Sequence, residues 1–172
     1  MGLGRYVTVI GAIIGILTVG ISLVLPELLA WWRLEVVNGG SIDGYYLTGL
    51  GGVVIRGTLI ERDASIPGLI GGIAVIVGAI LCIICAITEL KTLGFFGGIL
   101  MLTGPVLLYI DFLVRLSDLA RAIGIFVDGI GGGSLFWNSY DDGFYVYTWG
   151  LWIGFFAAAV GGFLGLLGGV AV

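Results

Sequence analysis

The sequence has no histidine and few charged residues. Of its 172 residues, only 7 are lysine or arginine and 11 are aspartate or glutamate, whereas 59% are apolar. The only methionines are Met1 and Met101, so the usual axial haem ligands are scarce and the commonest general base is absent. We therefore expect the chain to use no metal or organic cofactor.

Cysteine is equally scarce, because Cys82 and Cys85 are the only two. They lie within an apolar run, where a continuous helix places them poorly for a disulfide, and two thiols cannot complete a tetrahedral metal site. We interpret both as small packing residues. The loops contain no cysteine, so their structure must depend on hydrogen bonds, aromatic packing and partners.

The apolar residues are concentrated in four uncharged runs. Each run has about the 20 residues that cross the hydrocarbon of a bilayer. The runs cover residues 6–25, 67–88, 92–110 and 149–172. The sequence therefore predicts an all-α membrane protein, a single domain over residues 1–172 that is built as a four-helix transmembrane bundle and sits in the lipid bilayer.

Two long segments, residues 26–66 and 111–148, fall on the same side of this bundle. In the first segment Trp32, Leu34 and Val36 alternate with charged residues, which is the period of a half-buried strand. Asn38 then begins a turn, and further β-prone stretches follow. We predict a small antiparallel β-sheet in this first long loop.

The second segment begins with charged residues of alternating sign at helical spacing. These residues are Asp111, Arg115, Asp118 and Arg121. The pattern predicts that the third helix continues beyond the bilayer surface to about residue 123, with ion pairs along its protruding end.

The orientation of the chain depends on how its few basic residues are counted. Arg5 and Lys91 lie on the short side, while five arginines lie in the long segments, so a plain count favours long loops in the cytoplasm. Those arginines, however, are interleaved with ten acidic residues, and the only lysine is on the short side. We expect the long loops to lie outside, at the plasma membrane.

Small residues recur at four-residue spacing in every span. They let helix backbones approach closely where lipid supplies no hydrophobic drive for association. The residues predicted to pack helices, or to join this chain to another subunit, are Gly11, Gly15, Gly68, Gly72, Gly94, Gly98, Gly150, Gly154, Ala158 and Gly162. The last span has small residues on two faces, which leaves open whether one face meets another subunit.

Aromatic residues crowd the loop side of the sequence. The candidate interaction surface comprises Trp31, Trp32, Tyr45, Tyr46, Trp137, Tyr140 and Tyr145. Such rings are typical of membrane-interface anchors, and tryptophan and tyrosine are also enriched at protein-binding hot spots. Both interpretations stay open at this stage.

Several function classes are disfavoured by what the runs and loops contain. The apolar runs hold no ionisable side chain, which argues against a pump or carrier. No general base, metal set or phosphate loop accompanies the loop carboxylates, so we expect no enzyme. The net charge of −4 argues against nucleic acid as a partner.

The layout resembles the claudin and peripheral-myelin-protein superfamily. The likeness consists of four spans, a strand-rich first loop that begins near Pro26 and Trp32, a shorter second loop and very short segments on the other side. The run from Tyr145 to Gly162 resembles the start of that family's last helix. Gly49-Leu50-Gly51 stands where Gly-Leu-Trp is expected, and the paired loop cysteines are absent, so paracellular sealing is not implied.

Two functions follow from these observations. The first is a non-catalytic structural or adhesion-type membrane protein that associates through its helix faces and aromatic loops with copies of itself. The second is an accessory subunit that braces a larger membrane enzyme, for example of the respiratory or oxidase type, whose catalytic residues lie on other chains.

Overall fold

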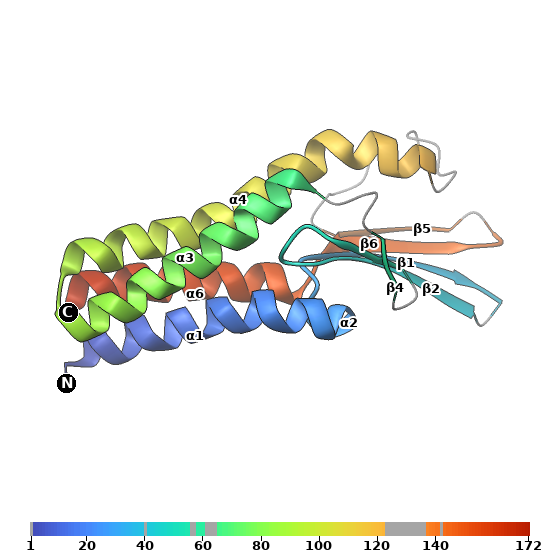
Figure 1. Ribbon diagram of the computed structural model, residues 1–172. Coiled ribbons are helices and arrows are strands. Elements are labelled where there is room, and N and C mark those ends of the chain that lie inside the picture. The colour runs from blue at the N-terminus through green and yellow to red at the C-terminus, as the bar shows by residue number, and fades with distance from the viewer. Residues whose placement is uncertain (1, 40, 56–57, 61–64, 123–136, 142) are drawn as a thin grey trace.

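A helical bundle carries a β-sheet at one end in the computed structural model of the chain (Figure 1). The structure describes residues 2–39, 41–55, 58–60, 65–122, 137–141 and 143–172. The N-terminus and the C-terminus both lie at the end of the bundle opposite the sheet (Figure 1). The two long segments therefore emerge at the same end of the bundle.

Four helices are long and apolar enough to cross a membrane, as the sequence predicts, which makes the chain a multi-pass membrane protein. They are α1 (Leu3–Val24), α3 (Ile66–Thr88), α4 (Lys91–Ala122) and α6 (Ile153–Ala171). A one-turn helix, α2 (Pro26–Leu29), follows α1. Helix α4 runs past the apolar part of its span, which ends at Asp111.

The ends of α3 are fixed by local sequence. Ser65 is its N-cap and accepts a hydrogen bond from the N–H of Gly68, and Pro67 lies in the first turn, where a missing N–H costs nothing. Glu89 ends the helix in the left-handed conformation, with φ of 63°. Its carboxylate pairs with Arg5, which ties the start of α1 to the turn between α3 and α4.

The helices pack with small residues inside and large ones outside. Helix α1 packs against α3 and α6, and α4 packs against the same two helices. Their backbones come close: a Cβ added to Gly11 would lie 2.6 Å from the carbonyl oxygen of Gly161, and one added to Gly78 would lie 2.5 Å from that of Gly97. The outward side chains, such as Ile10 and Phe163, are large and apolar, as a lipid environment requires.

The sheet is antiparallel and six-stranded, in the order β4-β3-β2-β1-β6-β5. The first long segment supplies β1 (Trp32–Asn38), β2 (Ser41–Leu47), β3 (Val53–Ile55) and β4 (Thr58–Ile60). The second supplies β5 (Trp137–Asp141) and β6 (Val146–Leu151), and β6 pairs directly with β1. The β1–β2 and β5–β6 turns each use glycine at positive φ, 52° at Gly39 and 88° at Gly143.

The small antiparallel sheet is confirmed, but the sequence analysis placed it in the first long segment alone. The prediction that the last span begins at Trp149 was wrong, because Trp149 and Gly150 belong to β6 and helix α6 begins at Ile153. The reason is the period of the preceding residues: Tyr145, Tyr147 and Trp149 alternate with Val146 and Thr148, which favours a strand. Strand β6, paired with β1, extends almost to the first residue of helix α6.

A matched pair of glycines in α1 tests the close helix packing. Gly11→Ala should lower the free energy of unfolding by about 1–3 kcal/mol, because its new methyl group would meet the backbone of α6. Gly20→Ala should cause no loss, since nothing lies within 4 Å of a Cβ there. Thermal unfolding of both variants in the same detergent checks this. An equal effect of the two substitutions would contradict the packing.

Candidate functional site

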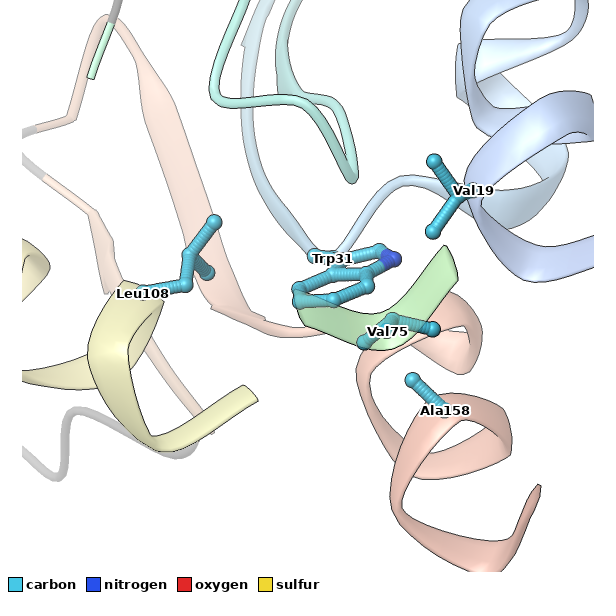
Figure 2. Close-up of a cluster of buried hydrophobic side chains, with 5 residues drawn as sticks. All are labelled: Val19, Trp31, Val75, Leu108 and Ala158. Atoms are coloured by element: carbon cyan, nitrogen blue, oxygen red, sulfur yellow. The ribbon is translucent and has the colours of Figure 1, made fainter. Parts of the chain in front are cut away.

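The bundle and the sheet meet around the side chain of Trp31, which is fully buried. Figure 2 shows the indole among four aliphatic side chains. Each comes from a different membrane helix: Val19 from α1, Val75 from α3, Leu108 from α4 and Ala158 from α6. We call this five-residue cluster the junction, because it joins one residue of the first loop with one residue from each of the four spans.

Backbone hydrogen bonds hold Trp31 on both sides. Its N–H donates to the carbonyl oxygen of Leu47 at 2.8 Å, and its own carbonyl accepts from the N–H of Trp152 at 3.0 Å. The N–H of Gly154 donates to Ala30 at 3.1 Å. The first loop is therefore bonded directly to the start of the last span. The indole Nε1 of Trp31 has no acceptor in the part of the chain that the structure describes.

A glycine-rich turn, residues 49–52, closes the junction. A Cβ at Gly49 would lie 2.8 Å from the Nε1 atom of Trp31, so a larger residue would displace the indole. The N–H of Gly49 donates to the Ser22 hydroxyl of α1 at 2.9 Å. Gly51, at φ of 73°, accepts from the N–H of Ser65 at 2.7 Å. The turn thus bridges the ends of α1 and α3.

Ser65 and Asp111 form a second buried contact beside this turn. Ser65 is 2% exposed and Asp111 8% exposed, and the Ser65 hydroxyl donates to the Asp111 carboxylate. The same hydroxyl oxygen accepts from the N–H of Gly68 at 2.8 Å. One serine therefore caps α3 and also ties it to α4 at the point where both helices reach the sheet.

The two faces of the sheet differ in character. Trp32, Leu34, Trp149 and Leu151 form a buried cluster on one face, and Tyr109 of α4 and Phe155 of α6 pack against it. The registers place Arg33, Tyr46 and Trp137 on the opposite face, because Gly150 of β6 lies opposite both Arg33 and Trp137. Having no side chain, Gly150 leaves the space between them open.

Arg33 lies against two tryptophan rings on this second face. Its Cζ is 3.3 Å from the ring centroid of Trp152 and 5.2 Å from that of Trp137, within the range of cation–π attraction. Its Nη1 donates to Glu35 at 2.7 Å. The Arg33 cluster, defined as Arg33, Glu35, Trp137 and Trp152, presents a half-exposed Trp137 ring beside a compensated charge.

Tyr46 lies opposite Arg33 on the neighbouring strand, and it is 8% exposed. Burial raises the pKa of its hydroxyl above the ordinary value, and the nearby carboxylates of Glu35 and Glu27 raise it further, while Arg33 lowers it. The tyrosine is therefore neutral at physiological pH and adds no charge to this face.

The predicted aromatic surface separates into two groups. Trp31, Trp32 and Tyr46 are buried, at 0%, 3% and 8% exposure, so they are core residues rather than surface residues. Trp31 packs among helix residues, Trp32 against strand β6, and Tyr46 against Ala30 and Val54. The sequence pattern of the first loop did not reveal these contacts. Tyr45 is half-buried, whereas Trp137, Tyr140 and Tyr145 are exposed.

The predicted small-residue set lies inside this chain. Gly11, Gly15, Gly68, Gly72, Gly94, Gly98, Gly154 and Gly162 each face another segment of the same chain at a distance that leaves no room for a side chain. Ala158 belongs to the junction, and Gly150 lies in β6 rather than in a helix. Of the predicted ion-pair residues, Asp111 bonds to Ser65, while the side chains of Arg115, Asp118 and Arg121 lie outside what the structure describes.

Three residues of the site were not singled out by sequence reasoning: Ser65, Trp152 and Glu35. Ser65 had a usable signal, since serine two residues before proline and an apolar run is a helix-start pattern. Trp152 had none, because its contact with Arg33 joins two segments far apart in sequence. Glu35 had a local signal, since it lies two residues from Arg33 on the same face of β1.

The chemistry available to the described residues is limited. No group of three metal-ligating side chains occurs among them, and Cys82 and Cys85 are buried as free thiols in α3. The polar groups that do come together, at Ser65 and in the Arg33 cluster, form hydrogen bonds and ion pairs to one another. They are suited to holding elements together and to contacting a surface.

No family model matches the chain. No curated protein matches it either.

The Ser65 contact supplies a test of the site's structure. Ser65→Ala should lower the free energy of unfolding by about 1–3 kcal/mol, because the N-cap is lost and the buried Asp111 carboxylate loses a donor. Thr88→Ala is the matched control, since that hydroxyl is exposed and bonds only within its own helix. Chemical unfolding in detergent micelles should separate the two variants; similar midpoints would rule the contact out as a stabilising one.

Proposed function

We propose that this chain is a non-catalytic structural protein of the plasma membrane that associates with copies of itself through its sheet. The observation that carries the proposal is the Arg33 cluster. It offers an exposed indole ring, flanked by an arginine and a glutamate, on the sheet face opposite the one that packs on the helices. Tryptophan, tyrosine and arginine are the residues that contribute most to protein interfaces.

The packing of the helices favours self-association through the sheet rather than through the membrane spans. The small-residue faces are occupied by contacts within the chain, so the outer faces of the helices carry large apolar residues that suit lipid. The sheet adds further exposed apolar residues at its far end, among them Ile42 at 65% and Phe144 at 83% exposure. These side chains favour contact with another protein surface.

The resemblance of the sequence to a claudin-like layout, with four spans and a strand-rich first loop, supports the proposal. We extend the proposal to orientation: the long segments face outward, since Arg5 and Lys91 lie at the opposite end and Glu27 follows the first span. The absent loop cysteines separate this chain from a sealing function, so the proposal is confined to self-association.

Mass spectrometry of the gently solubilised native assembly tests the proposal. We expect a multiple of this chain, and Trp137→Ala should weaken its self-association at least about tenfold, or ~1.4 kcal/mol, because the exposed indole is lost. Phe163→Ala, on the lipid side of α6, is the matched control and should leave the assembly unchanged. A monomer would overturn the proposal. Co-purified enzyme subunits that carry haem, flavin or metal would replace it with the accessory-subunit function.

A further inference from the structure

A hollow of about 390 Å³ lies where the first span leaves the bundle. Its volume is within the range of about 300–1,000 Å³ that is typical of small-molecule sites. One wall comes from the end of α1 and the start of α2, and the other from β3 and the connection that precedes it. The residues that shape it include Leu23, Val24, Leu25, Glu27, Thr48 and Val54.

The hollow sits at the boundary between hydrocarbon and water. Helix α1 ends at Val24, and Glu27 is the first charged residue after Arg5, so the apolar core of the bilayer ends between them. Val24 and Leu25 are 78% and 55% exposed, whereas Thr48 and Val54 of the opposite wall are buried. The exposed side is therefore apolar and continuous with the lipid-facing surface of α1.

Glu27 supplies the only charge among the described residues of the lining. Within the described ranges, ion pairs join Arg5 to Glu89 and Arg33 to Glu35, and neither includes Glu27. The backbone carbonyl of Glu27 accepts from the Trp152 Nε1 at 3.1 Å, which fixes the position of α2 beside the sheet. Its exposed carboxylate therefore extends from a fixed backbone position at the membrane surface.

We propose that this hollow binds one phospholipid of the surrounding bilayer and selects it by an ammonium headgroup, such as that of phosphatidylethanolamine. An acyl chain lies against Leu23 and Val24, and the ammonium group lies against the Glu27 carboxylate. Apolar contact supplies the retention, and the charge pair supplies the selection between headgroups. The lipid site needs no second protein, so its test is independent of the test of self-association.

Lipid discs that contain equal amounts of phosphatidylethanolamine and phosphatidylglycerol with the same acyl chains provide the test. Native mass spectrometry of the protein released from them should show one retained lipid, with the ethanolamine form favoured at least about fivefold. Glu27→Gln should reduce that ratio to about one while lipid is still retained. Val24→Trp should lower the total retained lipid, because the larger ring fills the hollow from its exposed side.

Two matched controls separate the site from general effects. Asp141→Asn removes one exposed acidic charge from the β5–β6 hairpin, and Val170→Trp adds the same ring to the lipid side of α6. Both should behave like the unmodified protein. Equal retention of the two headgroups by the unmodified protein, or the same ratio in Glu27→Gln, would overturn the proposal.

Discussion

The cluster that the Trp31 side chain forms with one residue from each of the four membrane helices is the contact on which the rest of the structure depends. The indole fills the end of the bundle where the helices carry small or medium side chains, and the backbone of the same residue is bonded to Leu47 of the first long segment and to Trp152 at the start of the last span. A displacement of this ring would therefore disturb the four spans and the sheet together. Gly49 has no side chain because the indole occupies the space that one would need.

The bundle buries small side chains and the sheet buries large ones, and the junction lies where the two kinds of packing meet. In the spans the small residues face inward, because lipid gives apolar residues no reason to leave the surface and close backbone contact supplies the attraction. In the sheet large residues such as Trp32 and Trp149 face inward, as they do in water. Trp31 lies at the boundary between the bundle and the sheet, where these two kinds of packing meet. The Arg33 cluster and the hollow beside Glu27 both lie near that boundary, so both proposed contacts depend on the junction for their position.

The sequence was sufficient for the helices and for the presence of a sheet, since apolar run length and alternation are local signals. It was insufficient for the pairing of β6 with β1, which joins segments more than a hundred residues apart and leaves no local trace. That pairing explains two of the errors: the aromatic run after Tyr145 is a strand, and Trp32 is buried against residues of that strand. Trp31 is buried among helix residues and Tyr46 against Ala30 and Val54, which are also contacts between separate segments. The small residues were identifiable by spacing, but the choice between contacts within the chain and contacts with another subunit required the helix arrangement.

Hydrogen–deuterium exchange of a Trp31→Ala variant in detergent is the most direct test of the junction. A central role for this residue predicts that amides of β1 and β6 and of the sheet-side ends of the helices lose protection together, with a free-energy loss of about 3–5 kcal/mol. Trp31→Phe should keep most of the protection, because the lost Nε1 has no acceptor among the described residues. Unchanged protection of the sheet in Trp31→Ala would contradict the dependence of the sheet on the bundle.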